Sequence, residues 1–176
     1  LAIRATEVYR KYSNYFNPEA RSTLKDTDIF QFAQLHLTPD TEDSKAINTV
    51  PSPKIVIAGS GMSTGGRILH HEQRYLPDAN STLLLIGYQS AGTRGRRLQD
   101  GAKEVDIFGE KIPVRARVEV IAGYSAHPDR EALMEFVRHS ADTLRRVFVI
   151  HGEAAAGLFF VQRVRDYLGI DARSPR

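Results

Sequence analysis

The chain has 176 residues, of which 41% are hydrophobic and 26% are charged, so it is long enough to bury a core and is neither a disordered chain nor a fibre. The absence of cysteine excludes a disulfide scaffold, a zinc ribbon and a thiol nucleophile. The net charge is +3, and 18 of the 24 basic residues are arginines, which suit bidentate contacts with phosphate. The sequence has neither a run of about 18 uncharged apolar residues nor a secretory signal pattern, so we expect a cytoplasmic protein with no membrane partner.

The excess of basic residues is local. Residues 1–53 carry 6 basic and 7 acidic side chains, whereas residues 54–100 carry 6 basic and 3 acidic ones, including Arg94, Arg96 and Arg97. This excess fits either a solvated basic face or an anion-binding surface. The chain starts with Leu1 rather than Met, almost directly on a helical pattern, so we expect it to be a fragment of a longer protein.

The first elements are predicted from helical spacing. Apolar residues recur at this spacing over residues 1–16, which predicts a helix packed on a sheet, and Asn17-Pro18 is predicted to end it. Residues 18–52 are mixed and polar, and we expect a loop-rich connection there with a short strand or helix near residues 30–37.

Two strand, loop and helix units follow. Lys54–Ala58 is a short apolar run that predicts a buried strand of a parallel sheet, and it leads into the first glycine loop, residues 59–66, and a helix over residues 67–76. The order repeats in a strand over residues 81–86, the second glycine loop, residues 87–95, and a short helix from Arg96.

The last third of the chain continues this alternation. Apolar and polar residues alternate over residues 114–120, which predicts a strand with one solvent-exposed face. A helix over residues 129–140, a strand over 146–150 and a helix over 157–168 are predicted after it. Strands that alternate with helices indicate an α/β fold.

The first glycine loop does not match either common nucleotide-binding motif. The dinucleotide fingerprint needs G-x-G-x-x-G, but here Thr64 stands where the third glycine belongs, and the next strand does not end on an acid. The phosphate loop of nucleotide hydrolases needs G-K-[ST], but Gly66 is followed by Arg67 and Ile68. We therefore expect neither NAD binding nor nucleoside triphosphate hydrolysis.

The two glycine loops nevertheless suit an anion. Backbone amides at the start of a helix, together with hydroxyl and guanidinium groups, form a cradle for phosphate. The alternative is a tight turn that binds nothing. The predicted phosphate-binding residues are Ser60, Gly61, Ser63, Thr64, Gly65, Gly66 and Arg67 of the first unit, and Thr93 and Arg94 of the second.

Two histidines stand at the ends of predicted strands. His127 follows the alternating strand, and His151 directly follows the strand over residues 146–150. Ligands of open α/β sheets bind at the carboxyl ends of strands, so each imidazole is a candidate metal ligand or proton donor rather than only a structural residue. The sequence contains neither H-x-H nor H-E-x-x-H, so the chain alone supplies too few ligands for a zinc site.

Three long strings resemble one protein family. They are SGMSTGGRILHHEQRYLPD at residues 60–78, GYQSAGTRGRRLQDGAKEVDIFGEKIPVRARVEVIAGYSAHPD at residues 87–129 and VFVIHGE at residues 147–153. In this order they resemble the β-CASP branch of the metallo-β-lactamase superfamily, which includes ribonuclease J. The resemblance implies a Rossmann-like β-CASP lobe with a parallel sheet, over residues 1–115, and a C-terminal piece of a metallo-β-lactamase αββα lobe, over residues 116–176.

The resemblance also implies roles for three residues. His127 matches the motif B histidine, which protonates the leaving oxygen, and His151 matches motif C, which holds one of two zinc ions. Ser125 resembles a residue that contacts the phosphate, and the glycine loops match surfaces that line an RNA channel. Pro128 departs from the small residue that commonly follows S-A-H, but it is compatible with a first helical turn. A histidine at motif C favours RNA over DNA.

The family string H-x-H-x-D-H and the acid of motif A are absent from the sequence. We therefore expect the C-terminal part of a zinc-dependent ribonuclease, inactive alone, that acts in RNA processing or decay as an endonuclease, a 5′ exonuclease or both. The alternatives are a non-catalytic nucleic-acid-binding module that has lost its metal ligands, and a DNA nuclease. The expected partners are single-stranded RNA and a second copy of the chain, since ribonucleases of this branch often form dimers.

Overall fold

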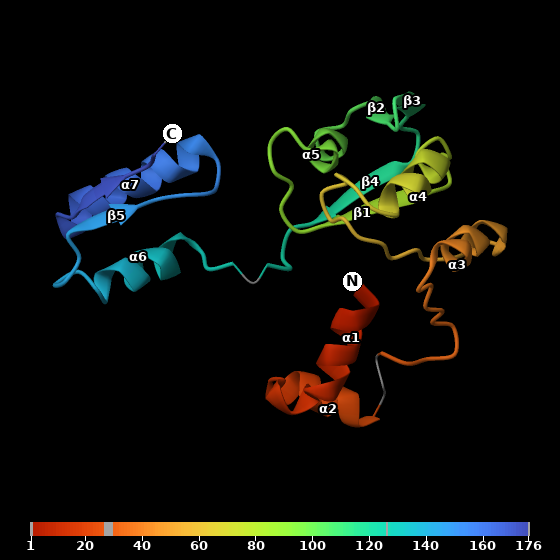
Figure 1. The fold of residues 1–176 in the computed structure, drawn as a ribbon, viewed down its shortest axis with the longest axis horizontal. Helices are drawn as coiled ribbons and strands as arrows, with labels where there is room; N and C mark the ends of the chain where they lie inside the picture. The colour runs from red at the N-terminus through yellow and green to blue at the C-terminus, as the bar shows by residue number, and fades with distance from the viewer. Residues whose placement is uncertain (1, 27–29, 126, 176) are drawn as a thin grey trace.

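The computed structural model describes residues 2–26, 30–125 and 127–175 (Figure 1). The elements in chain order are α1 (Ala2–Lys11), the 3-10 turn η1 (Ser13–Tyr15), α2 (Pro18–Asp26), α3 (Thr41–Ala46), η2 (Ile47–Thr49), α4 (Ile68–Tyr75), β1 (Thr82–Ile86), α5 (Arg94–Gln99), β2 (Glu104–Ile107), β3 (Glu110–Pro113), β4 (Arg117–Ile121), α6 (Arg130–Arg138), β5 (Arg146–Phe148), α7 (Ala154–Leu168) and β6 (Asp171–Arg173). Helices and pairs of parallel strands make up the structure, together with one antiparallel hairpin, which confirms the predicted α/β fold.

The N-terminal segment differs from the prediction in two respects. The helix α1 is present, but none of its residues is buried, so the expected packing on a sheet was wrong. Asn17-Pro18 separates two helices, because the Asn17 side chain accepts a hydrogen bond from the Ala20 amide at 2.8 Å and so caps α2. Pro18 is the first residue of α2, a position that proline favours.

The connection before the first glycine loop also contains a helix that the sequence analysis missed. Asp40 accepts a hydrogen bond from the Asp43 amide at 2.9 Å and caps α3. Residues 30–37, where a short element was expected, form neither a helix nor a strand, and residues 27–29 lie outside the described residues.

The strand predicted over Lys54–Ala58 was wrong. This segment is assigned to no strand, and in the described part of the chain no strand pairs with it. Ile55 and Ile57 are 92% and 84% exposed. The apolar run has the composition of a buried strand but lacks a neighbour here to bury it.

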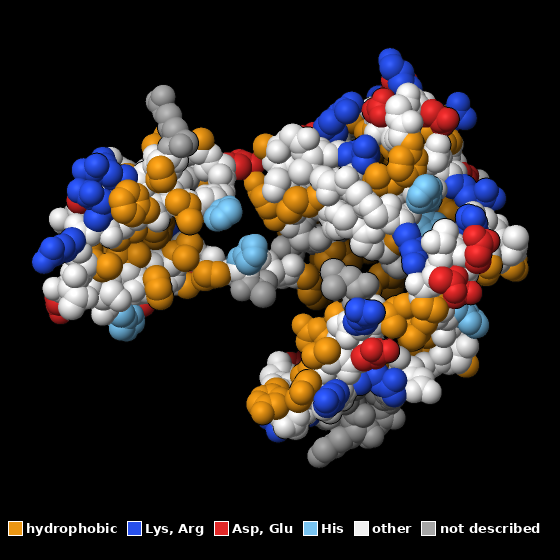
Figure 2. Space-filling model, viewed as in Figure 1, with side chains coloured by type: hydrophobic (Ala, Val, Ile, Leu, Met, Phe, Trp, Pro, Cys, Tyr) orange, Lys and Arg blue, Asp and Glu red, His pale blue; other side chains and the backbone are white. Residues whose placement is uncertain are grey.

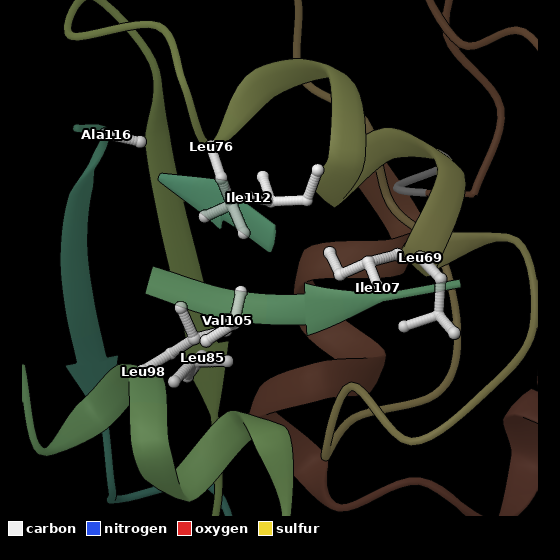
Figure 3. Packing of buried hydrophobic residues seen from close by; sticks show 8 residues of the cluster. All are labelled: Leu69, Leu76, Leu85, Leu98, Val105, Ile107, Ile112 and Ala116. Carbon is white, nitrogen blue, oxygen red and sulfur yellow. The ribbon is translucent and has the colours of Figure 1, made fainter. Parts of the chain in front are cut away.

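The first core lies around a pair of parallel strands, β1 and β4, which are in register from Thr82 with Arg117 to Ile86 with Ile121. Helices α4 and α5 and the antiparallel hairpin β2–β3 pack beside this pair (Figure 1). The buried side chains that meet in this core are Leu69, Leu76, Leu85, Leu98, Val105, Ile107, Ile112 and Ala116 (Figure 3). The predicted strand over residues 81–86 is confirmed, and the one over 114–120 starts later, at Arg117.

The second core is separate and lies in the C-terminal part. Strands β5 and β6 are parallel, and α7 connects them. The buried residues of this core are Met134, Val137, Val161, Val164, Ile170 and Ala172, which come from α6, α7 and the region of β6. The predicted helix after residue 129 is confirmed, and the last helix starts at Ala154, three residues earlier than predicted.

Apolar side chains remain exposed on both parts of the molecule. Leu84 and Ile86 of β1 are 47% and 54% exposed, and Phe148 and Ile150 at β5 are similarly exposed. Hydrophobic side chains accordingly gather at the surface in the space-filling view (Figure 2). Among the helices that the structure describes, none has the length and apolar character needed to cross a membrane.

Candidate functional site

The first glycine loop turns from the Lys54–Ala58 segment into α4. Gly66 has a φ of +76°, and a Cβ at this position would lie 3.0 Å from the carbonyl oxygen of Gly59, so this turn requires glycine. Gly61 and Gly65 face open space, because a Cβ at either position would meet no heavy atom within 4 Å. The backbone of the loop is therefore open to a ligand at Gly61 and Gly65.

Backbone amides in this loop are available as donors. Among the described residues, no acceptor bonds the N–H groups of Thr64, Gly65 or Gly66. The hydroxyls of Ser60 and Thr64 lie 3.0 Å apart and form a hydrogen bond with each other at the surface. This group of amides and hydroxyls at the start of α4 is the part of the predicted anion cradle that the structure leaves open.

Other predicted phosphate-binding residues are occupied inside the protein. Ser63 is 1% exposed and donates its hydroxyl proton to Glu72 of α4. Arg67 donates to the carbonyl oxygens of Thr38 at 2.6 Å and Pro39 at 2.7 Å. These two side chains hold the loop in place, and neither is free to meet a phosphate in this arrangement.

The second glycine loop fastens the first. Arg94 donates to the carbonyl oxygen of Ser63, and its Nε donates to that of Asp106 at 2.8 Å. The side chain of Gln89, 2% exposed, donates to the carbonyl oxygen of Gly61 at 2.9 Å. Thr93 caps α5 by accepting a hydrogen bond from the Arg96 amide at 3.2 Å. The two loops therefore form one surface, and the side chains of Thr93 and Arg94 support it from within.

Glu72 is buried beneath this joined surface. Burial raises the pKa of its carboxyl, and the hydrogen bond from Ser63 and the charge of Arg94 oppose this rise. The second carboxyl oxygen, Oε2, has no hydrogen-bond partner among the described residues, and neither has the amide oxygen of Gln89. Neither residue was predicted from the sequence to have a role, because the burial of Glu72 in α4 and of Gln89 in the second glycine loop is evident only from the tertiary structure.

Ser125 and His127 lie in the extended segment between β4 and α6. Both side chains are exposed, and the Ser125 hydroxyl accepts a hydrogen bond from the His127 amide at 3.2 Å. Asp129 then caps α6 by accepting a hydrogen bond from the Ala132 amide at 2.8 Å. The imidazole of His127 is therefore solvent-accessible, as a proton donor to a substrate must be.

His151 lies in the turn that joins β5 to α7. It has a φ of +64°, which is uncommon for a residue other than glycine, and Gly152 follows with a φ of +86°. Its imidazole is exposed and makes no hydrogen bond with the described residues. One free imidazole at a strand end can serve as a metal ligand. In the part of the chain that the structure describes, however, no three His, Asp or Glu side chains cluster to hold a metal ion.

The turn after His151 contacts the second glycine loop. The hydroxyl of Tyr88 donates to the Glu153 carboxylate at 2.6 Å, and this hydrogen bond raises the pKa of Tyr88. The guanidinium of Arg96 lies 3.4 Å from the same carboxylate oxygen. Neither Tyr88 nor Glu153 was predicted to have a role, although Glu153 belongs to the same string as His151 and an acid so close to a candidate ligand could have pointed to it.

Comparison with known proteins identifies the family. Residues 1–98 match the profile of the Beta-Casp domain, and residues 111–175 match the Zn-dependent metallo-hydrolase RNA specificity domain. The chain belongs to the β-CASP family. The predicted resemblance is thereby confirmed, and both glycine loops fall within the Beta-Casp match, up to residue 95.

Curated β-CASP relatives include a ribonuclease from Thermus thermophilus, 36% identical over 154 residues, which cover 87% of this chain and 35% of the relative. An RNase J-like protein from Methanocaldococcus jannaschii is 34% identical over 173 residues, or 98% of this chain and 39% of the relative. The transcription termination factor FttA of Methanosarcina mazei is 31% identical over 177 residues, which cover 97% of this chain and 28% of the relative. The chain thus spans only about a third of the length of these relatives.

Proposed function

We propose that this β-CASP chain is the C-terminal part of a zinc-dependent ribonuclease that hydrolyses RNA phosphodiesters. The observation that carries the proposal is the joined surface of the two glycine loops, with open amides at Thr64, Gly65 and Gly66. The names of the matched RNA specificity domain and of the ribonuclease relatives support RNA as the substrate. The division of the chain into lobes at residues 115 and 116, the cytoplasmic location and the homodimer remain predictions.

The phosphate would be held mainly by backbone groups. The open amides and the hydroxyls of Ser60 and Thr64 donate to phosphate oxygens, while Arg67 and Arg94 fix the loop that carries them. Binding to such a surface depends on phosphate charge, so the affinity for RNA falls as salt rises. Because the amides recognise phosphate rather than bases, the surface would accept many RNA sequences.

We assign separate roles to the two exposed histidines. His127 protonates the departing oxygen, and Ser125, whose hydroxyl lies beside the His127 amide, contacts the phosphate. His151 fits one position of a zinc site, because its imidazole is exposed and unbonded within the described residues, and the other ligands would come from outside this chain. Bound zinc would lower the pKa of a coordinated water and stabilise the negative charge that develops on the phosphate.

The test uses the full-length product of the gene that encodes this chain, with labelled single-stranded RNA and DNA of one sequence. We expect His127→Ala to lower the rate of RNA cleavage about 10²-fold or more. We expect His151→Ala to lose bound zinc and to lose RNA cleavage. His139→Ala is the matched control, because His139 is an exposed histidine on the far end of α6. Undiminished RNA cleavage by His151→Ala would contradict the assignment of the metal ligand.

Two other outcomes would replace the proposal. Salt-dependent RNA binding without zinc and without cleavage would indicate a non-catalytic nucleic-acid-binding module. Cleavage of DNA in preference to RNA would indicate a DNA nuclease.

A further inference from the structure

The side chain of Glu153 joins two distant parts of the chain. Its Oε1 accepts a hydrogen bond from the Tyr88 hydroxyl at 2.6 Å, across 65 positions of sequence, and lies 3.4 Å from Nη1 of Arg96, across 57 positions. Tyr88 belongs to the second glycine loop and Arg96 to α5, whereas Glu153 stands at the start of α7. One carboxylate therefore connects the anion-binding surface with the turn that carries His151.

Both partners of Glu153 are themselves held in place. The residue before Tyr88, Gly87, donates its amide proton to the carbonyl oxygen of Ile121 at 2.9 Å, which ties the loop to the end of β4. The Nε of Arg96 lies 3.0 Å from both carboxylate oxygens of Asp100. The hydroxyl and the guanidinium therefore reach Glu153 from fixed backbone positions.

The turn that carries His151 has no support from the Glu153 side chain within α7 itself. His151 and Gly152 both have left-handed backbone conformations, and the Glu153 side chain makes no capping hydrogen bond to α7. The backbone of Glu153 does take part in the helix, since its carbonyl oxygen accepts a hydrogen bond from the Gly157 amide at 2.9 Å. The carboxylate is thus free to fix the turn from outside, two residues after the imidazole of His151.

We propose that Glu153 is a positioning residue that holds His151 in register with the second glycine loop, an inference that rests on the role proposed above for His151. The bridge is half exposed, with side-chain exposures of 46% for Glu153 and 35% for Arg96, so it contributes little to folding stability. Its effect is on geometry, because a small displacement of a ligand or of the substrate reduces the rate of reaction strongly.

The test compares Tyr88→Phe, Glu153→Ala and the double variant in the full-length protein. Glu153→Gln is the conservative variant, since its amide oxygen can still accept the Tyr88 hydrogen bond. Tyr167→Phe is the matched control, because it removes a hydroxyl from an exposed tyrosine on α7. Three quantities are measured: the chelator concentration that removes half of the bound zinc, kcat for single-stranded RNA, and KM for the same RNA.

We expect Tyr88→Phe and Glu153→Ala each to weaken zinc retention and lower kcat, by about tenfold for Glu153→Ala, with KM within about twofold of the wild type. The double variant should behave as Glu153→Ala alone, because the two side chains act through one hydrogen bond. Glu153→Gln should restore most of the loss.

The two proposals fail in different ways. If the wild type retains zinc and cleaves RNA but Glu153→Ala matches Tyr167→Phe in zinc retention and in kcat, the positioning role is wrong and the proposed function stands. The positioning role would also be wrong if the fold-loss of kcat in the double variant equalled the product of the losses in the two single variants. If the wild type neither retains zinc nor cleaves RNA, the proposed function is wrong and the positioning role falls with it.

Discussion

Glu72 shows how a single buried carboxyl can set a pH dependence. It is 3% exposed, it accepts the hydrogen bond of Ser63, and burial raises its pKa. The folded protein therefore keeps the proton at pH values where the unfolded chain has released it. The free energy of unfolding should then decrease as pH rises from about 4.3, the pKa of a free glutamate, through the raised pKa of Glu72.

The variant Glu72→Gln tests this pH dependence. A glutamine cannot ionise but can still accept the hydrogen bond of Ser63, so the decrease in unfolding free energy over this range should be smaller than in the wild type. Urea unfolding at a series of pH values measures it. Glu135→Gln, which removes an exposed carboxyl of α6, should keep the slope of the wild type. An unchanged slope in Glu72→Gln would mean that Glu72 ionises equally in both states.

Gly95 lies in α5, where alanine would normally stabilise the helix by about 1 kcal/mol. Here a Cβ would lie 1.9 Å from the side-chain oxygen of Gln89 and 3.0 Å from the carbonyl oxygen of Met62. Gln89 is buried and bonded to Gly61, so it cannot move aside freely. We expect Gly95→Ala to lower the free energy of unfolding by about 1–3 kcal/mol, as overpacking does, in urea unfolding.

The control for this change is Gly123→Ala. A Cβ at Gly123 would meet no heavy atom within 4 Å. Its effect should stay within about 0.5 kcal/mol of the wild type. Equal stability of the two variants would show that the loops move apart easily at Gln89.

For single residues near the glycine loops, the sequence shows which kinds of side chain are present but not which groups they contact. Ser63 and Arg94 were predicted to contact phosphate, because hydroxyl and guanidinium groups beside glycines often do. In the structure both are turned inward, because Glu72 lies beneath the loop and the carbonyl oxygen of Ser63 needs a donor. These partners are 9 and 31 positions away, so no local pattern reveals them.

At the scale of elements, the caps determine where helices start. Asp129 caps α6 through the Ala132 amide, so Asp129→Ala should lower the free energy of unfolding of the second core by about 1 kcal/mol. Circular dichroism during urea unfolding measures the change. Asp142→Ala removes an exposed carboxyl from the turn after α6 and should have little effect. Equal losses in both variants would mean that the Asp129 hydrogen bond adds nothing to α6.

The caps also explain which elements were predictable. The helices after residues 66 and 129 have strong apolar periodicity and were predicted, whereas α2 and α3 are polar and are marked mainly by their caps, Asn17 and Asp40. The strand predicted at Lys54–Ala58 failed for a different reason. Composition shows that the segment suits a sheet, but only the tertiary structure shows whether a neighbouring strand is present.

At the scale of the whole molecule, the two separate cores should unfold independently. Leu98 is fully buried in the first core and Val164 in the second. We expect Leu98→Ala to reduce protection from hydrogen exchange in the first core by about 2–5 kcal/mol and to leave the second core unchanged. Val164→Ala should reduce protection in the second core and leave the first core unchanged. The reduction should be smaller than for Leu98→Ala, because valine loses fewer carbon atoms than leucine when it is replaced by alanine.

Mass spectrometry of peptides from the two cores separates these effects. A parallel loss of protection in both cores, from either substitution, would show that they unfold as one cooperative unit. The bridge at Glu153 is half exposed, so it should not make them cooperative by itself.

Each core is also built from one uninterrupted stretch of the chain. The buried residues of the first lie between Leu69 and Ala116, and those of the second between Met134 and Ala172. During synthesis, the first stretch is translated in full before translation of the second begins. The order of folding can therefore follow the order of translation, and neither core has to wait for a distant part of this chain in order to form.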